Sequence, residues 1–305
     1  MSRRWCSARD VAVLSAVAAL SAVVLVLTAC TPVSPAPPAP DEELPAGISV
    51  RVFQSRFDYA SRTLKVSVTN DGNSDLDLRD AAFSSPYFAG QTHYGDDLVL
   101  SPGMTRDLPV VLPSPVCSTA GEASGAPDPA TVVLTWQDPD GRVLSTSVTP
   151  RDDTDVLAQI LAEECLAEAV RAVASIAVGD ELRIDDGDGK PMARVDITIA
   201  PTGAAGTLTL TGVRSTVLLA PTTGESWPLS VALTADSQPL TVALDLRPTR
   251  CDPHAIAEDK RGTVFPLELS ASSTDLGTRS GLIDVTVSDH VRSQIYDWIT
   301  QYCNS

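Results

Sequence analysis

The sequence predicts a mainly β protein made of two tandem antiparallel β-sandwiches, each ending in one α-helix. Three observations lead to this fold. A pattern of apolar residues recurs after about 131 positions, which indicates an internal repeat. Apolar and polar residues alternate within each copy, as in strands that bury one face. Each copy closes on a helical pattern that contains a cysteine.

The repeat divides the folded part of the chain into two units. The copies share apolar residues at matching positions, which are Leu64, Val66 and Val68 in the first copy and Val195, Ile197 and Ile199 in the second. The segment LPVVLPSPVC, which ends at Cys117, matches VALDLRPTRC, which ends at Cys251. About 260 residues are available for folding, which is enough for two ordinary cores. We therefore predict one domain over residues 48–175 and a second over residues 176–305.

The strands of each copy are separated by turn signals. Residues 131–136 and 142–148 flank the sequence Asp-Pro-Asp-Gly, in which proline and glycine supply turn geometry. They predict a hairpin. The second copy has matching strands at 263–269 and 282–287, around a longer loop rich in serine and threonine. About seven short strands per copy favour an antiparallel sandwich.

The helix at the end of the second copy has the clearest pattern. Ser288 is a good N-cap, and Asp289 suits the positive first turn of a helix. The apolar residues that follow fall on one stripe, which we expect to pack on the sheets: Val291, Ile295, Trp298, Ile299 and Tyr302. The first copy has Leu157, Ile160 and Leu161 at the matching places. Residues 166–177 are able to continue this first helix straight into the second copy.

Four cysteines of the folded part predict two disulfides. They are Cys117, Cys165, Cys251 and Cys303, an even number in a chain that we expect to be exported. The repeat selects Cys117–Cys165 and Cys251–Cys303, because these pairs occupy equivalent places in the two copies. The sequence contains no C-x-x-C pair, so it supports neither a redox motif nor a zinc knuckle.

The amino-terminal segment has the three parts of a secretory signal peptide. Arg3, Arg4 and Arg9 precede an uncharged apolar run over residues 11–29. The run ends in Leu27-Thr28-Ala29-Cys30, which resembles the lipobox of bacterial lipoproteins. The resemblance implies cleavage of residues 1–29, acyl chains on Cys30 and attachment to the cell membrane. The alternative is an uncleaved transmembrane helix. Both interpretations place the rest of the chain outside the cytoplasm.

A proline-rich tether follows the predicted lipid anchor. Residues 30–47 contain TPVSPAPPAPDEELPAG and have no hydrophobic period. We expect a semi-extended spacer between the membrane and the first domain.

The opening strands also resemble a known family of domains. The pattern L-x-V-x-V, followed by Asn70-Asp71-Gly72, is similar to the immunoglobulin-like modules of bacterial surface proteins. The resemblance implies immunoglobulin-like antiparallel sandwiches. The chain departs from true immunoglobulin domains, since its predicted bridges join a strand to a helix rather than one sheet to the other.

The charge of the chain excludes one class of partner. The net charge is −17, and removal of residues 1–29, with three arginines and one aspartate, makes it −19. Such a surface repels nucleic acid and anionic lipid headgroups. We therefore expect no nucleic-acid partner.

The sequence lacks the common catalytic motifs that are defined by a short local pattern. The sequence has no G-x-S-x-G, H-E-x-x-H, phosphate-loop or G-x-G-x-x-G pattern. A Ser-His-Asp triad forms in space, so sequence alone leaves it open. Asp186-Gly187-Asp188-Gly189 lacks the later ligands of a calcium loop. Asp252, His254 and Glu258 would make a weak metal site. We predict no catalytic residue, no metal and no cofactor.

Residues 83–97 (FSSPYFAGQTHYGDD) are the candidate binding surface. They combine aromatic rings with amide and imidazole groups, which suit sugar or peptide contacts. The candidate ligand-binding residues are Tyr87, Phe88, Gln91, His93 and Tyr94. The alternative is that the aromatic rings plug one end of the first sandwich.

Together these features predict a lipid-anchored, extracytoplasmic envelope protein. We expect a non-catalytic binding or accessory module for an envelope protein or a cell-wall polymer. The alternatives are an envelope hydrolase that uses exposed carboxylates and a purely structural spacer.

Overall fold

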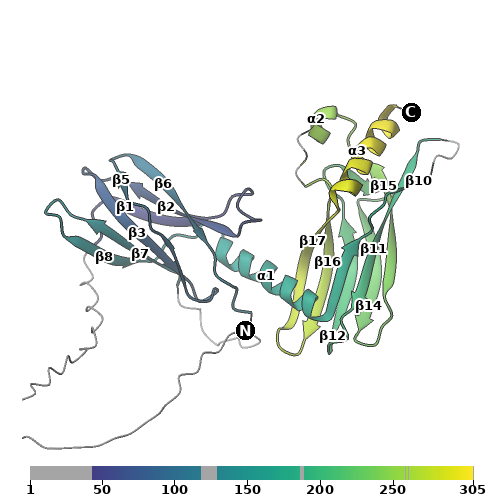
Figure 1. Cartoon of the computed structure of the whole chain (residues 1–305), viewed down its shortest axis with the longest axis horizontal. Coiled ribbons are helices and arrows are strands. Elements are labelled where there is room, and N and C mark those ends of the chain that lie inside the picture. Colours follow the sequence, from purple (N-terminus) through teal and green to yellow (C-terminus); the bar gives the residue numbers. More distant parts are fainter. Residues whose placement is uncertain (1–42, 118–128, 186–188, 258, 260, 305) are drawn as a thin grey trace, which may run out of the picture. The chain divides into compact units, whose positions relative to one another are not determined.

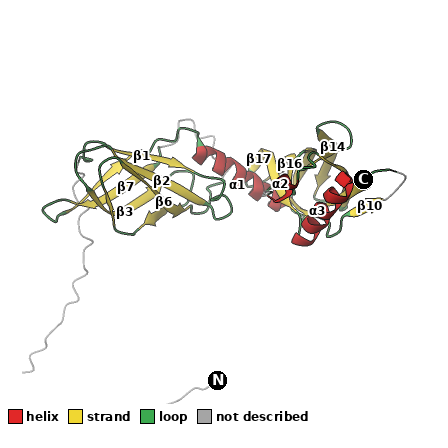
Figure 2. Cartoon of the chain, turned by 90° about the horizontal axis from the view of Figure 1, so that it is seen from above, coloured by secondary structure: helices red, strands yellow, loops and turns green. Residues whose placement is uncertain are grey.

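The computed structural model describes residues 43–117, 129–185, 189–257, 259 and 261–304 (Figure 1). Several predictions fall outside these residues: the signal peptide, the lipobox residues Leu27, Thr28 and Ala29, the lipidated Cys30 and most of the tether. Asp186, Gly187, Asp188 and Glu258 also lie outside them. Strands make up about half of the described chain, and helices make up much less (Figure 2).

The first copy contains eight described strands in two antiparallel sheets. They are β1 (Ile48–Phe53), β2 (Thr63–Asn70), β3 (Leu76–Ser84), β4 (Gln91–Tyr94), β5 (Leu98–Leu100), β6 (Met104–Val111), β7 (Thr131–Gln137) and β8 (Val143–Val148). One sheet has the order β1-β2-β6, and the other has the order β4-β3-β7-β8 with β5 also paired to β3. The predicted hairpin is present as β7 paired with β8.

The two sheets bury their inner faces against each other. Leu64, Val66 and Val68 on β2 are fully buried, and so are Leu134 on β7 and Leu78 on β3. All five belong to one hydrophobic cluster. The period-two pattern therefore predicted the buried face of β2 correctly, and the arrangement is a β-sandwich.

The second copy contains nine described strands, again in two antiparallel sheets. They are β9 (Ala174–Val178), β10 (Arg183–Asp185), β11 (Met192–Pro201), β12 (Gly206–Arg214), β13 (Leu219–Pro221), β14 (Ser226–Thr234), β15 (Leu240–Pro248), β16 (Val264–Ser273) and β17 (Gly277–Thr286). One sheet has the order β10-β11-β15-β13 with β9 on β11, and the other has the order β14-β12-β16-β17. Their inner faces form a second hydrophobic cluster.

The two copies share one strand order. The sheet β1-β2-β6 corresponds to β9-β11-β15, and β4-β3-β7-β8 corresponds to β14-β12-β16-β17. In each copy the fourth strand of the second sheet leads to a helix, namely α1 (Val156–Val173) or α3 (Asp289–Asn304). The fold class is therefore confirmed as mainly β with antiparallel sheets and a terminal helix. A short helix that the sequence did not predict, α2 (Pro253–Ala257), precedes β16.

Helix α1 belongs to both hydrophobic clusters. Val156, Leu157 and Ile160 pack in the first cluster. Residues further along the helix pack in the second cluster, namely Leu166, Ala169, Val170 and Val173. The chain leaves the helix at Ala174 and pairs with β11 as strand β9. The prediction that residues 166–177 extend the helix is thus wrong for its last four residues, which belong to β9 and include the β-branched Ile176.

The hairpin β16–β17 is longer than the sequence predicted. The residues expected to form a Ser/Thr-rich loop continue both strands, and the pairing extends from Val264 and Thr286 to Ser273 and Gly277. Hydroxyl groups hydrogen-bond across it, with Thr278 bonded to Ser272 at 3.1 Å and Ser280 to Ser270 at 3.0 Å. These cross-strand bonds explain why a polar segment forms a strand here.

Helix α3 begins where the sequence predicted. The Ser288 hydroxyl accepts a hydrogen bond from the Val291 N–H at 3.3 Å. Val291, Ile295, Trp298 and Ile299 are fully buried, and Tyr302 packs at the edge of the second cluster. The Trp298 indole N–H donates to the Pro191 carbonyl at 2.8 Å, so the ring is buried without an unpaired donor.

Candidate binding surfaces

The aromatic rings of residues 83–97 face mostly inward. Phe83 and Phe88 are 1% and 3% exposed, and both belong to the first hydrophobic cluster. Tyr87 and Tyr94 are half-buried and pack against the same cluster. The backbone around them is fixed, since the Val116 N–H donates to the Tyr87 carbonyl at 2.9 Å.

The polar candidates face outward instead. Gln91 and His93 are exposed on β4, where Thr92 and Tyr94 alternate with them and are half-buried. His93 Nδ1 lies 3.2 Å from an Asp80 carboxylate oxygen. The five predicted ligand-binding residues are therefore divided between two faces. The structure brings Gln91 and His93 together on the surface, and it buries Phe88.

Arg79 forms hydrogen bonds with several polar side chains near this sheet. It lies at a β-bulge between Leu78 and Asp80, where β3 loses its regular pairing with β7. Its guanidinium donates to Asp97 and to Asp77, each at 2.6 Å, and to the side-chain oxygen of Gln137. These bonds engage the guanidinium with the protein itself, which leaves it little freedom to bind a ligand.

Two strongly exposed aromatic residues lie in the loop between β1 and β2. Phe57 is 68% exposed and Tyr59 is 51% exposed. The Arg56 guanidinium lies 4.9 Å from the centroid of the Phe57 ring. Neither residue was predicted from the sequence, because the loop has no hydrophobic period and matches no motif. The sequence feature that could have identified them is a pair of aromatic residues on either side of one aspartate, Phe57-Asp58-Tyr59.

The buried Asp58 holds this loop in place. Its carboxylate accepts from the Ser55 hydroxyl at 2.6 Å and lies 3.4 Å from the Lys65 ammonium group. Its carbonyl accepts from the Thr63 N–H at 3.0 Å. The hydrogen bond from Ser55 lowers the pKa of Asp58, and this effect outweighs burial, which opposes it. The loop is thus a fixed support for its aromatic side chains.

Val111 adds an exposed aliphatic side chain near this loop. It is 61% exposed and pairs with Thr63 at the end of β6. The loop is bonded to the same strand end, since the Arg62 N–H donates to the Tyr59 carbonyl and the Leu112 N–H donates to the Arg62 carbonyl. We call Phe57, Tyr59 and Val111 the β1–β2 surface.

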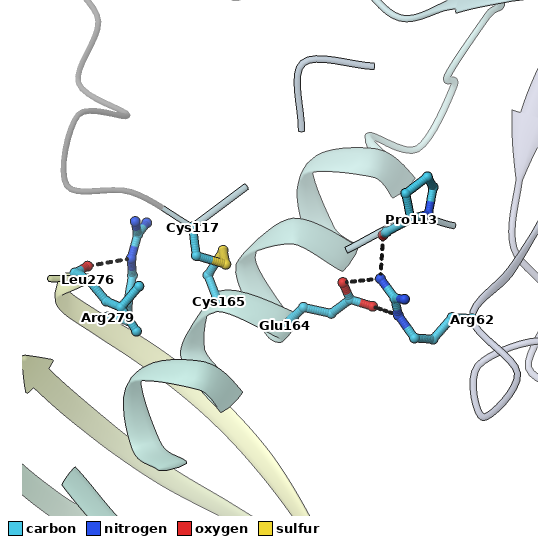
Figure 3. The surroundings of a disulfide bond; sticks show 7 residues. All are labelled: Arg62, Pro113, Cys117, Glu164, Cys165, Leu276 and Arg279. Atoms are coloured by element: carbon cyan, nitrogen blue, oxygen red, sulfur yellow. Dashed lines mark hydrogen bonds and ion pairs between the residues drawn. A yellow bond between two sulfur atoms is a disulfide. The ribbon is translucent and has the colours of Figure 1, made fainter. Parts of the chain in front are cut away.

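The first disulfide and an ion pair attach α1 to two segments of the first copy, one that precedes β2 and one that follows β6 (Figure 3). Cys117 is bonded to Cys165. Arg62 donates to both carboxylate oxygens of Glu164, at 2.5 and 2.8 Å, and to the Pro113 carbonyl at 2.7 Å. The neighbouring carboxylate raises the pKa of Arg62. This cluster has a structural role, because its charged groups are paired with one another.

The second disulfide joins Cys251 to Cys303. The structure thus contains the two pairings that the internal repeat selects. Two disulfides are typical of proteins in an oxidising compartment outside the cytoplasm.

A groove of about 590 Å³ lies along the strands at one side of the second sandwich. Its walls come from the last turns of α1, from β9 and from β17. Asp284 in this groove is paired with Arg261. Glu163 on α1 has a raised pKa, first because it is partly buried and second because Asp284 is near.

The described residues contain no group of three His, Cys, Asp or Glu side chains placed to hold a metal ion. His254 is exposed on α2. Within the same part of the chain, none of the helices has the length and apolarity needed to cross a bilayer.

Comparisons with known proteins name no family for this chain. No family model and no curated protein matches the sequence. Among solved structures, the chain is similar to a red sea bream transglutaminase, with a TM-score of 0.24 and 12% identity over 80% of this chain and 31% of that one. It thus spans about a third of that enzyme.

Two other solved structures share a low similarity with the chain. A biofilm-associated protein BSP domain has a TM-score of 0.21 and 10% identity over 80% of this chain and 59% of that one. The YadV chaperone has a TM-score of 0.18 and 10% identity over 74% of this chain and 94% of that one. We draw no functional conclusion from likenesses this low.

Proposed function

We propose that this chain is a lipid-anchored, extracytoplasmic binding module that carries out no catalysis itself. Its β1–β2 surface binds a protein partner in the cell envelope. The observation that carries this proposal is the exposure of Phe57 and Tyr59 on a loop fixed by the buried Asp58.

Exposed aromatic residues on a fixed loop suit protein binding for two reasons. Aromatic side chains are enriched among the residues that carry most of the binding energy at interfaces. A loop that is already ordered loses little conformational entropy on binding. The cation of Arg56 beside Phe57 adds a polar contact at the rim of such an interface.

The location of the module rests on two separate features. The Leu27-Thr28-Ala29-Cys30 motif at the end of an apolar run supports export and lipid attachment. The two disulfides support an oxidising compartment. A module held at the membrane by acyl chains and a proline-rich tether would meet partners within the envelope.

Photo-crosslinking in intact cells tests the binding surface. A photoreactive residue replaces Tyr59, and in the matched control it replaces Asp140 in the exposed turn between β7 and β8. We expect one recurrent protein adduct from position 59 that is absent from position 140 and is lost on adding Phe57→Ala. If the adducts formed with wall polymer alone, the partner of this surface would be a polymer and not a protein. Equal adducts from both positions would refute the proposal.

Metabolic labelling tests the anchor independently. Cells receive an alkyne analogue of palmitate, and the protein is purified from wild type, from Cys30→Ser and from the control Cys6→Ser, which changes a cysteine of the predicted signal peptide. We expect label on wild type and Cys6→Ser and none on Cys30→Ser. An unlabelled wild-type protein that stays in the membrane would identify the uncleaved helix instead.

A further inference from the structure

A second hollow, of about 530 Å³, lies at one edge of the second sandwich. The chain crosses there between the two sheets, from β12 to β13 and back to β14. Its lining combines two arginines, two glutamates and three hydroxyl residues: Arg214, Ser215, Glu225, Ser226, Arg247, Thr249 and Glu268, beside Ala220.

Strand pairing fixes where these groups lie. Arg214 on β12 pairs with Ser226 on β14. Arg247 on β15 pairs with Ala220 on β13, and the Thr249 N–H donates to the Leu218 carbonyl at 2.9 Å. The hollow therefore lies at the ends of strands from both sheets. Paired strands hold the polar side chains around it in fixed positions.

Arg247 differs from the other half-buried arginines of the described chain. Arg247 is half-buried as a residue, and its guanidinium has no hydrogen bond or ion pair with any described residue. Each of the others has a partner: Arg51 the Phe53 ring, Arg62 Glu164, Arg79 Asp97, Arg279 the Leu276 carbonyl and Arg292 Asp289. A guanidinium that lines a hollow and lacks a counter-ion is a group with which an anionic ligand would pair.

The neighbouring polar groups limit the charge of such a ligand. Arg214 lies 3.6 Å from the Glu268 carboxylate, which offsets its charge. Glu225 stands at the exposed side of the hollow. A monoanion pairs with Arg247 alone, whereas the second charge of a dianion would face two carboxylates.

Hydroxyl groups complete the recognition. Ser215 and Ser226 make no side-chain hydrogen bond to the described residues, so both are available as donors. The Thr249 hydroxyl donates to the Val217 carbonyl at 2.6 Å, so it lines the hollow without donating to the ligand.

We infer that this hollow binds the carboxylate group of a small ligand, with Arg247 donating two parallel hydrogen bonds and Ser215 and Ser226 donating one each. A peptide carboxyl terminus and an acidic sugar both supply this group. The inference goes beyond the β1–β2 surface and does not depend on the lipid anchor. It also explains a difference between the copies, since the repeat places Pro113 where the second copy has Arg247.

Amide chemical-shift mapping on the full folded chain tests the inference. The probes are acetyl-alanyl-alanine, its carboxyl-terminal amide, glucuronic acid and inorganic phosphate. We expect saturable shifts at Ser226, at Thr249 and at the Trp227 indole N–H with the free-acid peptide or with glucuronic acid. We expect none with the peptide amide, because it lacks the carboxylate. The stronger of the two acids identifies the source of the ligand.

Two variants distinguish the specific contribution of Arg247 to binding from the effect of positive surface charge in general. Arg247→Gln should weaken binding about tenfold or more, the loss expected for a bidentate charge-assisted pair. Arg250→Gln, which removes an exposed arginine outside the hollow, should leave the affinity unchanged. If Arg247→Gln fails to fold, Ser226→Ala in its place should weaken binding. Equal shifts with acid and amide, stronger binding of phosphate, or unchanged binding in Arg247→Gln would each overturn the inference.

Discussion

Arg62 and Glu164 join the start of strand β2 to the middle of helix α1 through two parallel hydrogen bonds, at 2.5 and 2.8 Å. Arg62 also donates to the Leu112 and Pro113 carbonyls, although its own backbone has a φ of 52°, which non-glycine residues rarely adopt. The next helix residue, Cys165, forms the disulfide with Cys117. One turn of α1 thus holds both a covalent and an ionic attachment to the first copy.

The ion pair should contribute modestly to stability. Glu164→Gln keeps the shape of the side chain and removes its charge. Because both partners are partly exposed, we expect the free energy of unfolding to fall by about 1 kcal/mol. Urea unfolding of this variant and of Asp107→Asn, which neutralises an exposed acid on β6 of the same copy, measures the difference. The effect should shrink at high salt, and equal losses in the two variants would show that only net charge matters.

The disulfides should contribute more. Cys251 and Cys303 are separated by 52 residues, and the chain-entropy model gives about 4 kcal/mol for a loop of this length. We expect Cys251→Ser with Cys303→Ser to lower the free energy of unfolding by about that amount. Urea unfolding followed by tryptophan fluorescence reports it. The double variant Cys117→Ser with Cys165→Ser is the matched comparison. If removal of the Cys251–Cys303 bridge changed the free energy of unfolding by nearly zero, the packing of α3 alone would hold the helix in place.

Patterns with a strict period predicted their elements well. The alternation of Leu64, Val66 and Val68 gave the buried face of β2, and the stripe of α3 gave its buried face. These predictions succeed because burial of one face imposes the period directly. The two disulfides followed from the repeat, since equivalent places in two copies share their neighbours.

The candidate surface was harder to predict, because the orientation of a side chain in an irregular segment depends on distant partners. Residues 83–97 contain Gly and Pro, so the short strand β4 within them had no visible period. Composition alone does not tell that Phe88 turns inward to meet the first cluster. Phe57 and Tyr59 face outward because Asp58 is buried between them, which is a contact that no sequence motif records.

The loop that supports the β1–β2 surface should lose stability in acid. The Ser55 hydrogen bond lowers the pKa of Asp58 in the folded state, so the folded state favours the ionised carboxylate. This contribution is fully present above the ordinary pKa of 3.8 and is lost as the pH falls below it towards the folded value. Ser55→Ala should therefore lose less stability than wild type between neutral pH and pH about 3.

Urea midpoints at a series of pH values test this expectation. Ser61→Ala is the control, because its hydroxyl donates to the Asp58 carbonyl rather than to the carboxylate. The control should lower the midpoint by the same amount at every pH. Parallel curves for wild type and Ser55→Ala would contradict the assigned role of Ser55.

Tyr296 should contribute to the loss of stability of the second copy at alkaline pH. Burial raises its pKa to about 12, and the hydrogen bond that its hydroxyl donates to Asp259 at 2.8 Å adds to this effect. The folded state thus holds the proton more tightly than the unfolded state, whose value is 10.0. The contribution to stability is complete below pH 10.0 and is lost as the pH rises to about 12.

Absorbance at the phenolate band, recorded while the pH is raised, measures this titration directly. Wild type should show one tyrosine step near pH 12, which Tyr296→Phe removes and Tyr59→Phe leaves in place. Tyr296→Phe should also flatten the decline of stability between pH 10.0 and about 12. At neutral pH it should cost about 1 kcal/mol, because the hydrogen bond to Asp259 is lost. If a step near pH 12 persisted in Tyr296→Phe, the high pKa would belong to another tyrosine. The loss of stability at alkaline pH would then not depend on the hydrogen bond between Tyr296 on α3 and Asp259.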